Sequence, residues 1–135
     1  MTQPIDMLTG AQTAVVTLLQ TQLPPAERGM VRHSLKKGAE PPFHLIGDIA
    51  SENAGTKDDQ FEEIEVDVHT VYRGTDRGEL LKLMHQVRAA ADEETVEVAG
   101  ATFRVSFLGA LASGAASDGV TFAGITTLQL SAEPA

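Results

Sequence analysis

Hydrophobic and polar residues alternate strictly along residues 61–72, in the stretch FEEIEVDVHTVY. The even positions, beginning with Ile64, are mostly apolar, whereas three successive odd positions carry acids. Because successive side chains of a β-strand point to opposite faces, this period predicts a strand with one face on a core and the other in water. We call the three acids on the polar face the acidic row; they are Glu63, Glu65 and Asp67.

Two other segments have the spacing of amphipathic helices. Residues 5–22 place apolar side chains three and four positions apart, and the prolines at 24–25 end this pattern because proline lacks an N–H and fixes φ. Residues 76–91 repeat the spacing, and Asp76 followed by Glu79 predicts a capping box at their start. The stripe of the second helix that we expect to be buried consists of Leu80, Leu83, Met84, Val87 and Ala91.

Turn residues and alternation predict five further strands and a short tail. These strands are expected at residues 30–34, 43–50, 96–98, 103–107 and 120–130, and residues 131–135 are expected to be a frayed tail. The resulting order, α-β-β-β-α-β-β-β, has short connections between successive strands. We therefore predict an α+β fold, in which two amphipathic helices pack on one face of a mostly antiparallel sheet. The chain of 135 residues is expected to form one domain.

The composition narrows the classes of function. The chain has no cysteine, which excludes a disulfide scaffold and thiolate catalysis by its own side chains. Its start, MTQPIDMLTG, has neither the basic nor the apolar region of a signal peptide, and no apolar run approaches the ~20 residues of a membrane span. The net charge of −9 argues against a dedicated nucleic-acid binder, which must neutralise phosphates.

The charges are unevenly distributed along the chain. Residues 46–72 contain eight acids and a single base, Lys57. Residues 24–42 instead contain four bases and two acids. This second region is either a solvated loop or a contact with a partner. Its four bases, which we call the basic segment, are Arg28, Arg32, Lys36 and Lys37.

No motif in the chain predicts chemistry. The acidic row has the oxygen ligands that Ca²⁺ or Mg²⁺ prefers, but a straight row does not converge on one ion. The four histidines lack metal-binding spacing, and no serine lies in a G-x-S-x-G frame. We therefore expect no catalytic residue, no metal and no cofactor. The simplest interpretation of the acidic row is a solvated face, and the alternative is a surface with an electrostatic role.

The order of these elements resembles the tail completion or tail terminator proteins of long-tailed phages and of phage-derived particles such as gene transfer agents. The resemblance covers residues 5–131, and its specificity lies in an ordered set of motifs rather than in any one of them. Tyr72 stands where the family often has Trp, and residues 28–38 form an insert that does not align. The matching motifs are PPFHLIGD, with Pro42, Phe43, Leu45, Ile46, Gly47 and Asp48, then VYRG (residues 71–74) with its following helix, VEVAG, and SDGV.

The resemblance implies a non-enzymatic protein of the virion that is assembled in the bacterial cytoplasm. It implies a homohexameric ring at the head-proximal end of a tail tube, which stops polymerisation of the tube protein and meets the neck or head-side connector. DNA would pass through the lumen without specific binding, and no membrane is involved. Alternatives are another neck component, either a head-completion or a stopper protein, and, from another class, a cytosolic small-molecule or metal-binding module.

In a ring, the acidic row has two possible electrostatic roles. It can line the lumen, where carboxylates repel DNA phosphates, or it can form a rim that meets a basic partner. A neighbour's basic segment is one such partner. We favour the lumen, because three evenly spaced acids suit a repulsive lining better than a paired contact. Higher salt should then strengthen the ring, whereas pairing with the basic segment predicts that salt weakens it.

Overall fold

The structure is a computed structural model that describes residues 3–35 and 38–135. The predicted order of helices and strands is confirmed, with one short 3-10 helix added after the first α-helix. The elements are α1 (Met7–Gln22), η1 (Pro25–Met30), β1 (Val31–Arg32), β2 (Phe43–Asn53), β3 (Glu62–Arg73), α2 (Arg77–Ala91), β4 (Thr95–Val98), β5 (Ala101–Ala112) and β6 (Thr121–Pro134).

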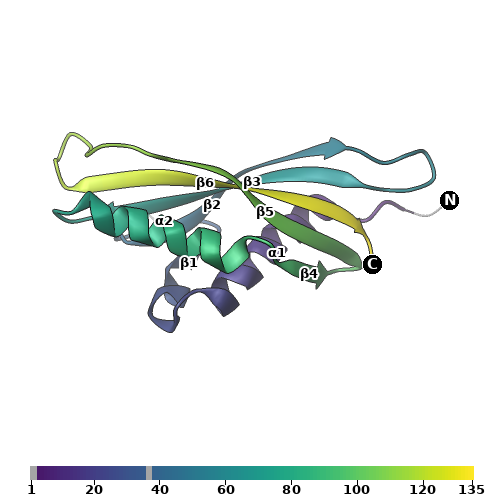
Figure 1. The fold of residues 1–135 in the computed structure, drawn as a ribbon, viewed down its shortest axis with the longest axis horizontal. Helices are drawn as coiled ribbons and strands as arrows, with labels where there is room; N and C mark the ends of the chain where they lie inside the picture. Colours follow the sequence, from purple (N-terminus) through teal and green to yellow (C-terminus); the bar gives the residue numbers. More distant parts are fainter. Residues whose placement is uncertain (1–2, 36–37) are drawn as a thin grey trace.

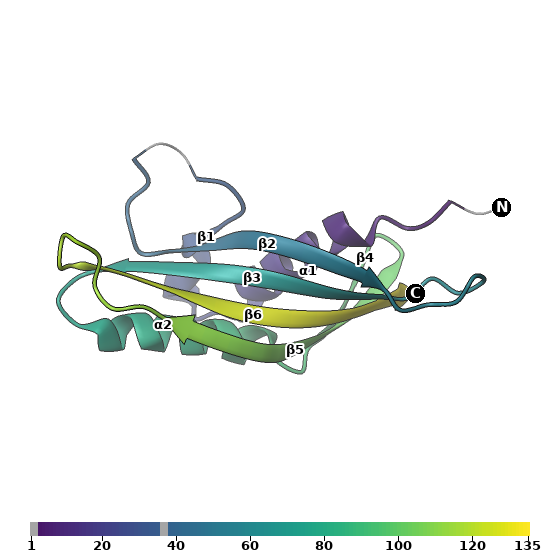
Figure 2. The same cartoon turned by 90° about the horizontal axis from the view of Figure 1, so that it is seen from above.

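The six strands form one twisted sheet in the order β1-β2-β3-β6-β5-β4. Every neighbouring pair is antiparallel except β1 and β2, which are parallel. Figure 1 shows α1 and α2 on the same side of the sheet, and Figure 2, seen from above, shows the strands in front of both helices. The α+β prediction is therefore confirmed, and we call the side without helices the open face.

The core lies between the sheet and the two helices. The alternation in β3 is confirmed, because Ile64, Val66 and Val68 are fully buried. Phe103 of β5 and Leu19 of α1 are also fully buried in the same cluster. A smaller cluster of Leu80, Met84 and Phe122 lies under the start of α2, with Tyr72 packed against it.

The two α-helices begin at aspartate caps. Asp6 Oδ1 accepts a hydrogen bond from Thr9 N at 3.0 Å, so α1 begins after Asp6 rather than at the predicted residue 5. At α2, Asp76 Oδ1 accepts from Gly78 N at 2.8 Å. A capping box also predicts that the Glu79 carboxylate accepts a hydrogen bond from the backbone N–H of Asp76. This part of the prediction is wrong, because the Glu79 side chain instead pairs with Lys82, one turn later.

The buried stripe of α2 differs from the prediction at two positions. Leu80, Met84, Val87 and Ala91 are buried as predicted, but Leu83 is only half-buried and Ala90 is buried as well. Positions 80, 84, 87 and 91 follow one line along α2, and positions 83 and 90 both flank it on the same side.

The predicted frayed tail at residues 131–135 is instead mostly strand, because β6 continues to Pro134. Ala132 is fully buried and pairs with Glu62 of β3 and Phe103 of β5. The inward alternation of Leu128 and Leu130 continues through Ala132, so this end of the chain has apolar surface to bury.

Candidate functional site on the open face of the sheet

The acidic row lies on the open face and is held by β6. Glu63 is opposite Ser131, and its carboxylate accepts hydrogen bonds from Ser131 Oγ and from Gln129 Nε2, each at 3.1 Å. Asp67 Oδ1 accepts from Thr127 Oγ1 at 2.8 Å. A row of hydroxyl and amide donors on β6 therefore fixes the direction of two carboxylates, while the middle one, Glu65, is exposed.

The other half of the open face is apolar. Leu108 and Leu111 of β5 are 50% and 71% exposed, and Leu111 is opposite Ile125 of β6. On the other side of β6, Ile125 is opposite His69 of β3, which follows Asp67, the last residue of the acidic row, by two positions. The open face is therefore divided along the strands into an acidic end and an apolar end.

Two open depressions on this face show the division. One, of about 340 Å³, has Glu52, Glu63 and Glu65 in its lining. The other, of about 430 Å³, lies at the boundary and has both Asp67 and Leu111 in its lining. Within the described ranges, no group of three or more His, Asp or Glu side chains is arranged to hold a metal ion.

The two described bases of the basic segment lie on different sides of the sheet, because Arg28 is in η1 with the helical layer, whereas Arg32 follows the core residue Val31 in the edge strand β1 and is exposed on the other side. Arg28 is in η1, where its Nε donates to Leu23 O at 2.9 Å, and Arg32 in β1 donates from Nη1 to Val31 O at 3.1 Å and to Gly29 O. Lys36 and Lys37 lie outside the described residues. Figure 1 shows η1 beyond α1, on the far side of the helical layer from the open face. Neither described arginine forms an ion pair with the acidic row within this subunit.

His44 is the one histidine that the structure places fully inside the protein, among the residues it describes. Its Nδ1 lies 2.8 Å from Thr70 Oγ1, and burial lowers the pKa of its imidazole from 6.5 to about 4. His44 and His69 lie on opposite faces of the sheet, because His44 is opposite Thr70 and His69 is opposite Leu45, the next residue along β2.

Sequence reasoning missed the apolar end of the open face. The predicted strand 103–107 stops before it, whereas β5 continues through a bulge between Phe107 and Gly109. The bulge shifts the alternation by one residue, so Leu111 points to the open face. The sequence does contain a signal for this apolar surface, namely two leucines, Leu108 and Leu111, within the stretch FLGAL (residues 107–111).

Comparisons with known proteins give a likeness of fold. No family model matches the chain, and no curated protein matches it. In the described residues, no helix has the length and apolar character that crossing a membrane requires. A chain in the solved structure "Virion of native gene transfer agent (GTA) particle" superposes with a TM-score of 0.82, covering 93% of this chain and 97% of that chain at 14% identity. The two chains share the fold over nearly their whole lengths.

Proposed function

We propose that this chain is a structural tail terminator of a phage-type particle. Six copies form a ring that closes the head-proximal end of the tail tube. The observation that carries the proposal is the superposition on a gene transfer agent virion chain over 93% of this chain and 97% of that one. The ordered motifs from PPFHLIGD to SDGV support the terminator role within such a particle.

The division of the open face suits a ring that surrounds DNA. Carboxylates repel phosphates, so a lumen lined by the acidic row lets DNA slide without being bound. The hydrogen bonds from Thr127, Gln129 and Ser131 fix the direction of the Glu63 and Asp67 carboxylates, and no base of the described residues forms an ion pair with the row. The apolar end of the open face, with Leu108 and Leu111 exposed, suits a protein contact.

The ring acts through its surfaces and not through catalysis. Its partners are other copies of the chain, the tail tube protein and the connector on the neck side. In a ring of identical subunits, each copy contacts its two neighbours through two different surfaces. Such head-to-tail contacts close into a ring when the rotations between successive copies add up to one full turn.

Electron microscopy and sedimentation of the purified protein, alone and with tail tube protein, test the role. The expected result is a six-membered ring that binds one end of the tubes and limits their length. A protein that remains monomeric and leaves tube growth unchanged contradicts the proposal. A ring that binds the connector but not the tube would instead assign the chain to another part of the neck.

A further inference from the structure

A groove lies between α2 and β5, on the helical side of the sheet. It has a volume of about 250 Å³, and its lining includes Leu81, Met84, Arg88 and Phe107. Leu81 is 46% exposed, although it is a large apolar side chain. The guanidinium of Arg88 lies 4.1 Å from the centre of the Phe107 ring, which holds a positive charge at the wall of the groove.

The strand beside this groove has an uncovered edge. β4 pairs only with residues 101–104 of β5, and the backbone of Val105 is bonded to Glu93 and Glu94. Beyond Phe107, whose N–H donates to Asp92 Oδ1, no strand of the described residues pairs with the outer edge of β5. The groove therefore has an apolar floor beside a strand edge that a further chain can approach.

Bases outnumber acids on α2 beside the groove. Arg77, Lys82 and Arg88 are exposed along this helix, whose single acid, Glu79, pairs with Lys82; of the three bases, Arg88 lines the groove. A partner that fits the groove should therefore be acidic around a small apolar contact.

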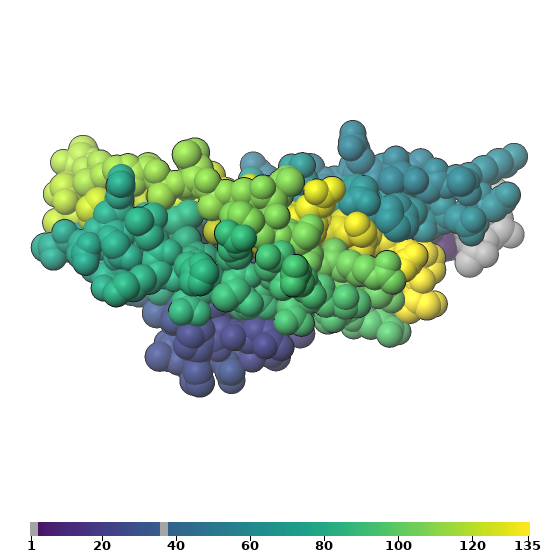
Figure 3. Space-filling model, viewed as in Figure 1, coloured from purple at the N-terminus to yellow at the C-terminus, as the bar shows by residue number. Residues whose placement is uncertain are grey.

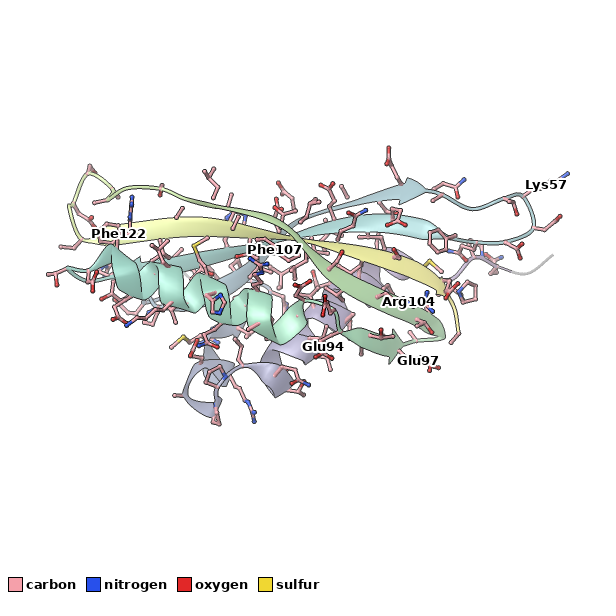
Figure 4. The ribbon with its side chains drawn as sticks, viewed as in Figure 1. Lys57, Glu94, Glu97, Arg104, Phe107 and Phe122 are labelled. Atoms are coloured by element: carbon pink, nitrogen blue, oxygen red, sulfur yellow. The ribbon has the colours of Figure 1, made fainter. Side chains whose placement is uncertain are left out.

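The β2–β3 hairpin of the chain has the complementary charge. Residues 50–62, which we call the acidic hairpin, carry Glu52, Asp58, Asp59 and Glu62 against one base, Lys57. Figure 4 shows Lys57 at one end of the long axis, with Phe107 near the middle and Phe122 at the opposite end. The space-filling view shows the same hairpin projecting beyond the body of the molecule (Figure 3). The hairpin tip therefore does not reach the groove of its own subunit.

The acidic hairpin is already ordered for docking. Its turn is closed by a hydrogen bond from Thr56 N to Asp59 O at 3.0 Å. Gln60 braces its base, because its side chain bonds both the N–H and the carbonyl of Ile5 at 2.9 Å. Such preorganisation lowers the entropy lost on binding.

We propose that the groove between α2 and β5 binds the acidic hairpin of a second copy of this chain. The contact joins two different surfaces, so it is heterologous and propagates from copy to copy until the ring closes. This inference rests on the proposed ring and states which surfaces form it. The acidic row remains free to face the lumen, since it lies on the open face and the groove lies on the helical side.

Chemical crosslinking tests the contact directly, because the chain contains no cysteine of its own. Chains with Lys57→Cys are mixed with chains with Leu81→Cys and treated with a short thiol-specific crosslinker. The expected product is a crosslinked pair of one chain of each kind. Neither variant alone should give this yield, since the contact joins position 57 to position 81. A mixture of Lys57→Cys with Gln20→Cys, on the exposed side of α1, is the matched control.

Charge reversal tests the electrostatic part. Asp58→Lys/Asp59→Lys in the hairpin, and separately Lys82→Glu/Arg88→Glu beside the groove, should each weaken assembly at least about tenfold. All four substitutions in one chain should restore assembly toward that of the wild type. This restoration separates a lost contact from a misfolded variant.

The outcomes distinguish this contact from the terminator role. If the wild type forms rings while positions 57 and 81 do not crosslink and the reversed hairpin assembles normally, the groove assignment is wrong and the ring remains. If positions 57 and 81 crosslink in chains that never cap a tube, the contact remains and the terminator role is wrong. A wild type that stays monomeric and gives no crosslink overturns both.

Discussion

His44 Nδ1 lies 2.8 Å from Thr70 Oγ1 across the β2–β3 pair, and both side chains are fully buried. His44 Nε2 is buried without a hydrogen-bond partner among the described residues. A proton on this imidazole would therefore add a charge to the core without compensation, which is the reason that its pKa falls to about 4.

We expect this histidine to make the fold sensitive to acid. The unfolded chain binds a proton at His44 below pH 6.5, whereas the folded chain binds it only near pH 4. The contribution of neutral His44 to stability is therefore fully present above pH 6.5 and falls by up to about 1.4 kcal/mol for each pH unit from there down to about pH 4, below which both states bind the proton. NMR titration should show His44 neutral at pH 5.5. A His44 imidazole that is already protonated at that pH contradicts this prediction.

Substitutions in α2 should separate its buried line from its flank. Leu80→Ala removes a fully buried side chain and should lower the free energy of unfolding by about 2–5 kcal/mol. Leu83→Ala should cost less, because Leu83 is half-buried. Urea unfolding measures both, with Lys82→Ala as the exposed control. Equal costs at positions 80 and 83 would show that the flank is as well packed as the line.

Gly10 should resist substitution although it lies within α1. A Cβ at this position would meet the Phe103 ring at 2.7 Å, closer than real Cβ atoms pack. Gly10→Ala should therefore destabilise the protein, despite a gain in helix propensity of up to about 1 kcal/mol. A double-mutant cycle with Phe103→Leu measures the coupling, because the smaller side chain should tolerate the alanine better. A Gly10→Ala variant that is more stable than the wild type would exclude this close packing.

Neutralising the acidic row should leave the proposed ring intact. If the row lines the lumen, Glu63→Gln/Glu65→Gln/Asp67→Asn removes its repulsion for phosphates, and we expect rings as stable as the wild type that retain DNA at low salt. Sedimentation with and without duplex DNA measures both properties, and Glu97→Gln, away from the row, is the matched control. Rings that dissociate after neutralisation would show instead that the row pairs with a neighbour, for which the basic segment is the candidate.

The sequence alone determined the elements whose signal is local. The alternation of β3, the helical spacing of α1 and α2 and the turn at Ala99-Gly100 each depend on neighbours a few residues away. Both turn residues have positive φ, at 51° and 85°, as the tight hairpin requires. The acidic row was placed correctly on a polar strand face for the same reason, since the period of two fixes which side chains share a face.

The tertiary structure decided what depends on distant segments. The sequence did not predict that β6 would extend to Pro134, because Ala132 is buried only through its pairing with β3 and β5. It did not reveal that β4 leaves the end of β5 uncovered, since strand order and register are set by packing across the whole sheet. The position of the acidic hairpin, far from the groove of its own subunit, is likewise a property of the fold. Local patterns determine the faces of single elements, and only their assembly determines which surfaces remain for a partner.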